Sequence, residues 1–174
     1  MEAPKVEFLE HLARKLDPSV GEAYFEGRKF LRHGNGGGWR ESTSTVSPEA
    51  FIGEYALVLD RSRVLGMSQV MDSSVVLGNG RVGGRAEVRG NSRIKDSSVI
   101  ANASVLNSYV MDRSMVLDEA RIVESALYGC KIYGGASIDR CMLRDVKTDK
   151  NLISIEHYRD GNGFLHLLGY LLGR

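Results

Sequence analysis

The histidines and cysteines are the residues of this chain whose types could serve catalysis or metal binding. The chain has 174 residues, with four histidines and two cysteines. Histidine is the most frequent general base near neutral pH, and His33 and His157 are the candidates for that role. His11 is expected on the surface of a helix, and His166 within apolar packing. No histidine occurs from residue 34 to residue 156, which leaves the middle of the chain without this kind of base.

The cysteines do not predict a metal site or a disulfide framework. Zinc motifs need cysteine and histidine ligands at short, characteristic spacings, and neither Cys130 nor Cys141 has such neighbours. Two thiols in a chain of this length are also too few for a disulfide scaffold. We expect both cysteines to be small buried residues rather than reactive thiols.

The glycine run from Gly34 to Gly38 is the other segment with possible chemistry. A glycine-rich loop can hold a phosphate when it leads into the N-terminus of a helix. Here the run leads into a segment with a strand pattern, which makes the phosphate hypothesis weak. We expect instead a tight turn of the backbone beneath the first repeat, with Trp39 as its hydrophobic lid.

A repeat of six residues runs through the middle of the chain and must position any site. A small residue stands two positions before each aliphatic residue of the repeat, and Gly, Asp or Asn stands two positions after most of them. The aliphatic positions are Val46, Ile52, Val58, Val64, Val70, Val76, Val82, Val88, Ile94, Ile100 and Leu106.

This spacing predicts a three-sided parallel β-helix. Side chains two apart on a strand share a face, so the small and the aliphatic residue point inward together. The Gly, Asp or Asn lets the chain bend once in every repeat. With three repeats per coil, residues 46 to about 143 are expected to make about six coils. Two shortened repeats are expected, where Val110 follows Leu106 and Ile132 follows Tyr128 on the inside.

The pattern resembles the hexapeptide-repeat superfamily, whose best-known members are trimeric acyltransferases built on a left-handed parallel β-helix. The segment His33-Gly-Asn-Gly-Gly-Gly-Trp39 also resembles the start of the β-helix in short, repetitive bacterial members. The resemblance covers residues 33–143. It implies an all-β fold, left-handed coiling and a homotrimer, and the handedness comes from the resemblance rather than from the spacing.

The resemblance leaves two functions open. Superfamily acyltransferases bind coenzyme A between adjacent subunits and use a histidine on or beside an extruded loop. No long insertion interrupts residues 46 to 106 here, and only His33 and His157 could line such a groove. We therefore favour a non-catalytic homotrimer that acts as an assembly or binding module. The alternative is an acyltransferase that uses coenzyme A or acetyl-coenzyme A, with binding residues that the sequence does not identify.

Apolar residues at outward positions predict an interface with other copies of the chain or with another protein. One outer face is expected to be apolar, a second to carry Leu65, Val99, Met115, Leu117 and Tyr133, and the third to be polar. The interface candidates are Leu57, Leu59, Val75, Leu77, Tyr109, Met111, Leu127, Phe164 and Leu168.

The two ends of the chain are expected to cover the ends of the β-helix. A first helix has an apolar stripe of Val6, Leu9, Ala13 and Leu16, and a second is expected from Ser19 to about Leu31. The chain thus divides into an N-terminal helical cap (1–32), the β-helix (33–146) and a C-terminal capping or oligomerisation segment (147–174). This last segment is either helix or strand, and it could instead anchor a foreign protein.

Composition sets the remaining expectations. A net charge of +1 gives no reason to expect nucleic acid or a membrane surface as a partner. The first residues lack an apolar signal core, and no run of about 18 apolar residues could span a bilayer. The sequence therefore predicts a cytoplasmic protein.

Overall fold

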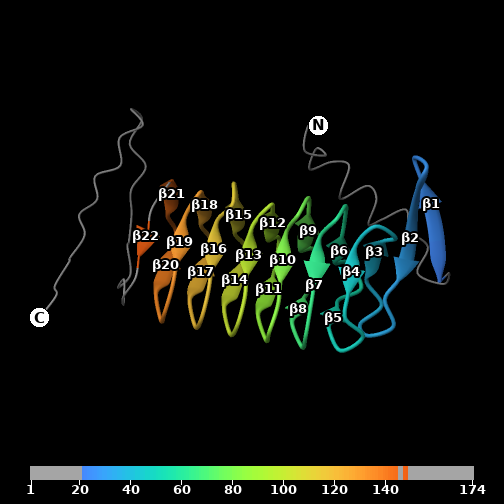
Figure 1. Cartoon of the computed structure of the whole chain (residues 1–174), viewed down its shortest axis with the longest axis horizontal. Helices are drawn as coiled ribbons and strands as arrows, with labels where there is room; N and C mark the ends of the chain where they lie inside the picture. The colour runs from blue at the N-terminus through green and yellow to red at the C-terminus, as the bar shows by residue number, and fades with distance from the viewer. Residues whose placement is uncertain (1–20, 145–146, 149–174) are drawn as a thin grey trace, which may run out of the picture.

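The computed structural model describes residues 21–144 and 147–148, which form short strands joined by tight turns (Figure 1). The strands make three sheets, which we name A, B and C. Sheet A contains β1 (Glu22–Phe25), β2 (Arg28–Arg32), β3 (Trp39–Glu41), β6 (Leu57–Val58), β9 (Val75–Leu77), β12 (Arg93–Lys95), β15 (Tyr109–Met111), β18 (Ala126–Tyr128) and β21 (Met142–Arg144). Sheet B contains β4 (Thr45–Val46), β7 (Arg63–Val64), β10 (Arg81–Val82), β13 (Ser98–Val99), β16 (Met115–Val116), β19 (Lys131–Ile132) and β22 (Lys147–Thr148). Sheet C contains β5 (Phe51–Ile52), β8 (Gln69–Val70), β11 (Glu87–Arg89), β14 (Ser104–Leu106), β17 (Arg121–Val123) and β20 (Ser137–Asp139).

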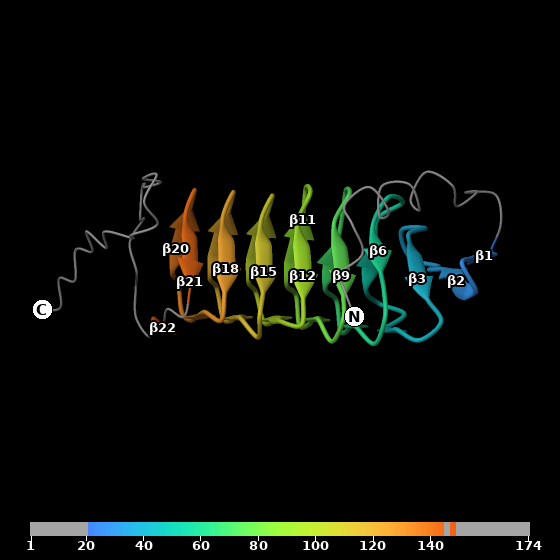
Figure 2. The ribbon, with the colours of Figure 1, turned by 90° about the horizontal axis from the view of Figure 1, so that it is seen from above.

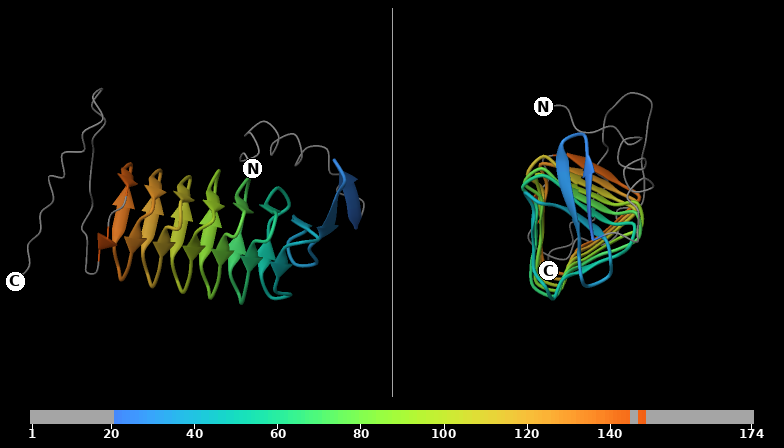
Figure 3. Two further views of the ribbon diagram at one scale, coloured as in Figure 1. Left: turned by 45° about the horizontal axis from the view of Figure 1, so that its top comes forward. Right: turned by 90° about the vertical axis from the view of Figure 1, so that its right-hand side faces the viewer.

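The three sheets enclose a triangular column in which each coil contributes one strand to each sheet (Figure 3). From β3 onward every strand pairs in parallel with the strand three places further along the chain. The six strands of sheet C correspond to six coils. The predicted parallel β-helix of hexapeptide repeats is therefore confirmed, and its left-handed coiling stays a prediction.

Aliphatic side chains fill the interior in columns, one for each sheet. In sheet B, Val64, Val82 and Val99 lie above one another in register and are fully buried. Burial of one such side chain contributes about 1.5–3 kcal/mol, so the stack of coils is held mainly by this interior. The core also includes the small inward residues of the corners, Ala50, Ala86 and Ala120 among them.

The register after Ile94 differs from the sequence prediction. Val99 and Val105 are fully buried, whereas Ile100 lies on the outside and Leu106 is partly exposed. Later in the chain, Leu127 rather than Tyr128 points inward. The expected pair of four-residue repeats is therefore wrong, because the chain instead uses several repeats of five residues.

Five-residue repeats arise where one corner residue replaces two. Val76 pairs with Ile94 after a coil of 18 residues, but Ile94 pairs with Val110 after only 16. At each shortened corner a single residue takes a positive φ and the small inward residue follows at once. These corner residues are Asp96, Asn107, Glu124, Gly129 and Arg140.

The corners are also tied to one another along the column. The carboxylate of Asp60 accepts a hydrogen bond from the backbone N–H of Gly78 in the next coil, at 2.9 Å. Asp72 and Asp118 bind Gly90 and Gly134 in the same way. An aspartate with φ near 55° both makes the bend and bonds the neighbouring coil, which explains its frequency at these positions.

Serine hydroxyls form a second ladder, inside one corner. The backbone N–H of Ser108 donates to Ser92 Oγ at 3.1 Å, and that of Ser125 donates to Ser108 Oγ at 3.0 Å. Cys141 continues the series, and Cys130 takes the same place at another corner, above Ser114. Both cysteines are buried, as expected for residues in the small inward position.

The predicted second N-terminal helix is wrong. Residues 22–32 form an antiparallel hairpin of β1 and β2, and β2 pairs antiparallel with β3. Glu26 and Gly27, both with positive φ, make the two-residue turn, which has the geometry favoured in hairpins. The first predicted helix and the C-terminal segment lie outside the described residues. In the part of the chain that is described, no helix reaches the length and apolar character that a membrane span requires.

Candidate functional site

His33 is the one candidate base among the described residues, and it lies in the wall of the first coil. Its side chain is 8% exposed, and Nε2 lies 2.9 Å from the carbonyl oxygen of Ala50. A carbonyl only accepts hydrogen bonds, so Nε2 carries the proton and donates it. In this arrangement His33 ties the segment before β3 to the first coil. His11, His157 and His166 lie outside the described residues, and the catalytic roles suggested for His33 and His157 stay predictions.

The glycine run packs tightly against the first coil, as predicted. A Cβ on Gly38 would lie 2.3 Å from the carbonyl oxygen of Gly53, and one on Gly36 would lie 2.4 Å from that of Ile52. The N–H of Gly38 donates to Ile52 at 2.8 Å, and the N–H of Ile52 donates to Asn35 at 3.0 Å. Trp39 follows as a buried side chain, with the guanidinium of Arg32 stacked over its ring.

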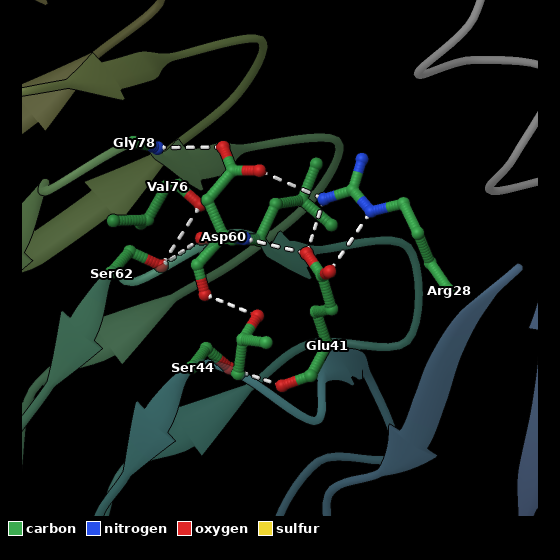
Figure 4. Close-up of polar contacts among 9 residues, drawn as sticks. Arg28, Glu41, Ser44, Asp60, Ser62, Val76 and Gly78 are labelled. Carbon is green, nitrogen blue, oxygen red and sulfur yellow. Dashed lines mark hydrogen bonds and ion pairs between the residues drawn. The ribbon is translucent and has the colours of Figure 1, made fainter.

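A partly buried ion-pair network joins the hairpin to the first coils (Figure 4). Arg28 donates through Nε and Nη2 to the two carboxylate oxygens of Glu41, and Nη2 also contacts Asp60 at 2.9 Å. The backbone N–H of Asp60 donates to Glu41 at 2.7 Å. Because Asp60 in turn binds Gly78, the network links β2, β3 and two successive corners.

The electrostatics of Glu41 follow from these contacts. Burial alone would raise the pKa of the Glu41 carboxyl, but the hydrogen bonds from Arg28 and from the N–H of Asp60 outweigh it and hold the pKa below the ordinary value of 4.5. The hydrogen bond with Glu41 likewise raises the pKa of Arg28. The sequence analysis did not predict this network, because its members lie in three separate segments that only the folded chain brings together.

The first half of the outer face of sheet A is already buried within the chain. Leu57, Leu59, Val75 and Leu77 point outward from β6 and β9, yet they are 0–4% exposed. With Phe30 and Trp39 they make a cluster that we call the outer cluster. Their role at a subunit interface stays a prediction. That prediction assumed that these four side chains form an exposed patch, and they do not.

The remaining interface candidates divide into three groups. Leu127 is fully buried in the core, so its expected outward position is wrong. Tyr109 is 37% exposed and Met111 partly exposed on β15, where Arg93 stacks over the Tyr109 ring at 5.6 Å. Phe164 and Leu168 lie outside the described residues.

Sheet B presents a continuous outward column of mostly apolar side chains, which we call the sheet B column. Backbone hydrogen bonds place Leu65 beside Gly83, then Ile100, Leu117 and Tyr133 in successive coils. Leu65 is 40% and Ile100 37% exposed, and the last two are partly exposed. Val99 was expected on this outer face, but it points inward. Ile100 takes the outward place predicted for Val99, because the repeat before it has five residues.

A second column on sheet B, next to the first, carries cations. Arg63 pairs in register with Arg81, and both are exposed. Within residues 21–144 neither makes an ion pair. The outer side of sheet C carries the predicted polar residues Gln69 and Glu87 in register on β8 and β11, but also Leu106 and Val123 in register on β14 and β17. Among the described residues no cluster of histidine, cysteine and acidic side chains could hold a metal ion.

Comparisons with known proteins give little beyond the architecture. No family model matches the chain, and no curated protein matches it. One matching solved structure is a hexapeptide transferase family protein from Anaplasma phagocytophilum, with 20% identity over 60% of this chain and 73% of that one and a TM-score of 0.36. The assignment therefore rests on the strand pairing and the inward columns themselves. By these criteria the chain is a three-sided parallel β-helix of hexapeptide repeats.

Proposed function

We propose that this protein is a non-catalytic β-helix that assembles as a homotrimer and serves as an assembly or binding module. The observation that carries the proposal is the sheet B column. Leu65 and Ile100 lie exposed there and Leu117 and Tyr133 are partly exposed, in one column that only Gly83 interrupts, with a regular strand spacing of about 4.8 Å. Extended apolar faces of this kind are uncommon on monomers and are typical of interaction surfaces.

A second copy of the chain is the occupant that fits this face best. A straight apolar column matches another straight apolar column, and a closed ring about a three-fold axis lets every copy cover its face in the same way. Arg63 and Arg81 lie beside the column without carboxylate partners among the described residues, so carboxylates of a neighbouring copy could pair with them.

Substitutions on two faces test the proposal. Wild-type protein is expected to sediment at three times the chain mass of 19.2 kDa. Ile100→Lys places a charge in the sheet B column and should shift the protein to monomer at micromolar concentration. Gln69→Lys places the same charge on sheet C and should leave the trimer intact. Circular dichroism confirms that both variants keep the fold. A monomeric wild type, or a trimer that survives Ile100→Lys, would refute the proposal.

The alternative function is a coenzyme A-dependent acyltransferase with its site between subunits, which rests on the superfamily resemblance. A thermal-shift experiment with acetyl-coenzyme A separates the two. A ligand at 100 times its dissociation constant stabilises the folded protein by about 2.7 kcal/mol. No shift is expected at millimolar acetyl-coenzyme A. A shift that is lost in His33→Asn or His157→Asn would favour the enzyme.

A further inference from the structure

The outer face of sheet A changes in character halfway along the column. Its N-terminal half carries the outer cluster, whose side chains are almost fully buried and pack against Ala23 and Phe25 of β1. Its C-terminal half consists of β12, β15, β18 and β21, which lie side by side (Figure 2). We call the outward side chains of these four strands the sheet A patch. It is made of the residues directly before and after the buried Ile94, Val110, Leu127 and Leu143.

The sheet A patch is positively charged. Arg93 and Lys95 point outward from β12 and Arg144 from β21, and none of the four strands contains an Asp or Glu. Among the described residues these three cations form no ion pair. The patch therefore presents three positive charges that have no carboxylate partner in the described part of the chain.

The corners that border the patch supply little negative charge. The carboxylate of Asp96 already accepts hydrogen bonds from Asn79 in the coil before it. Asp112 is followed in the same corner by Arg113, and both side chains are exposed. Among the described residues of these corners this leaves Glu124, one carboxylate against three cations, so the patch keeps its positive charge.

Tyrosine and methionine side chains fill the rest of the patch. Tyr109 is 37% exposed and Met142 is 64% exposed. The guanidinium group of Arg93 stacks over the Tyr109 ring at 5.6 Å, and that of Arg144 stacks over the Tyr128 ring at 5.6 Å. Tyrosine, methionine and arginine are the residue types enriched where proteins bind one another, and tyrosine and arginine contribute most of the binding energy there.

The stacked guanidinium groups favour a protein partner over a nucleic acid. Binding of single-stranded nucleic acid depends on aromatic rings that are free to stack with bases. In the patch one face of the Tyr109 ring and one face of the Tyr128 ring already hold a guanidinium group. A guanidinium group on a ring still donates hydrogen bonds to carboxylates, and methionine adapts its shape to aliphatic side chains.

We propose that the sheet A patch binds an acidic segment of another protein, in which carboxylates alternate with aliphatic side chains. Carboxylates bond to Arg93 and Lys95, and aliphatic side chains pack on Tyr109 and on the neighbouring methionines. An extended segment presents every second side chain on one face, so glutamate and leucine two positions apart meet the patch together. The proposal names a partner for the binding role proposed above and rests on that role. It does not rest on the trimer, which uses sheet B.

Methionine methyl groups give a direct readout in the full chain. The probe is a synthetic peptide of repeated Glu-Ser-Leu-Ser units, added to protein with isotope-labelled methionine methyl groups. The NMR signals of Met111 and Met142 in the patch should shift, whereas that of Met67, which is 53% exposed at a corner away from sheet A, should not. Equal shifts of all three signals, or no shift at millimolar peptide, would overturn the proposal.

Two charge reversals separate the patch from general electrostatic attraction. Arg93→Glu should weaken binding of the peptide about ten-fold, because a charge-assisted hydrogen bond is replaced by repulsion. Arg121→Glu makes the same change at an exposed position on sheet C and should leave the affinity unchanged. Circular dichroism verifies that both variants are folded. Equal loss of affinity in the two variants would contradict a site on sheet A.

Two further ligands test the chemistry of the partner. A peptide with serine in place of leucine should bind about ten-fold more weakly, and equal affinity would refute the aliphatic contact. A single-stranded oligonucleotide that shifts the same methyl signals at lower concentration than the peptide would refute the protein partner. A trimeric wild type that does not bind the peptide would refute this proposal and leave the proposed assembly standing, and a monomer that binds it would do the reverse.

Discussion

Glu41 shows how a single carboxylate can hold two parts of the chain together. It accepts hydrogen bonds from Arg28 on the hairpin and from the backbone of Asp60 on the first corner, in a nearly buried setting. Replacing the carboxylate weakens the hydrogen bonds that Arg28 and the N–H of Asp60 donate to it in this partly buried network. We expect Glu41→Gln to lower the free energy of unfolding by about 1–3 kcal/mol, as measured by chemical denaturation at pH 7.

The lowered pKa of Glu41 predicts that the free energy of unfolding depends on pH. The folded state holds the pKa of Glu41 below 4.5, so its stabilising contribution is fully present above pH 4.5 and is lost as the pH falls through the lower, folded-state value. The stability difference between wild type and Glu41→Gln should therefore shrink below pH 4.5. A difference that stays constant down to pH 2 would contradict the role of the charge.

The glycines offer a matched pair at the residue scale. A Cβ on Gly38 would meet backbone and side-chain atoms of the first coil, whereas a Cβ on Gly34 has nothing within 4 Å. Gly38→Ala should destabilise the protein by about 1–3 kcal/mol through overpacking. Gly34→Ala should be neutral or stabilising by up to about 1 kcal/mol, because it restricts the unfolded chain. Thermal unfolding of both variants tests whether the close packing of Gly38 against the first coil contributes to stability.

At the scale of the elements, hydrophobic spacing predicted the coils up to Ile94 and failed after it. Val99 and Ile100 are adjacent and both β-branched, so hydrophobicity alone cannot say which one points inward. The deciding residue is Asp96, whose positive φ makes a corner from one residue instead of two. The hairpin was missed for a related reason. Its aromatic and aliphatic residues suit helix or strand, and the Glu26-Gly27 turn is a weaker signal than Asn-Gly.

The corrected register is testable by truncating the two neighbours. Val99→Ala removes buried methyl groups and should cost about 2–3 kcal/mol. Ile100→Ala removes exposed surface and should change the unfolding free energy of the monomer by less than about 0.5 kcal/mol. Both substitutions are therefore compared in a background that is already monomeric, such as Leu117→Lys in the sheet B column. A larger loss of unfolding free energy in Ile100→Ala than in Val99→Ala would mean that Ile100 points inward, as an uninterrupted six-residue period predicts.

At the scale of the whole molecule, the three-sided column could be predicted from the repeat. The distribution of exposed apolar surface could not, because Leu57 and Val75 carry the same outward pattern as Leu65 and only the folded chain distinguishes them. The position of His33 could not be predicted either, because its hydrogen-bond partner is the backbone carbonyl of Ala50.

Assembly makes stability depend on concentration. If three copies associate through the sheet B column, the midpoint of thermal unfolding should rise with protein concentration, because association stabilises only the folded state. Differential scanning calorimetry over a hundred-fold range of concentration measures this, with Ile100→Lys expected to show no dependence. A wild-type midpoint independent of concentration would argue against a trimer that forms on folding.

The antiparallel hairpin of β1 and β2 gives the N-terminal end of the column a strand arrangement that differs from the parallel coils after it. At the N-terminal end, the hairpin occupies the edge of sheet A, and Arg40 stands in register with the buried Val58, where a further coil would need an aliphatic residue. A guanidinium at that position opposes the stacking of another molecule on this end. At the edge of sheet A, the hairpin and Arg40 therefore oppose the end-to-end addition of another β-helix, which is the characteristic hazard of solenoid proteins.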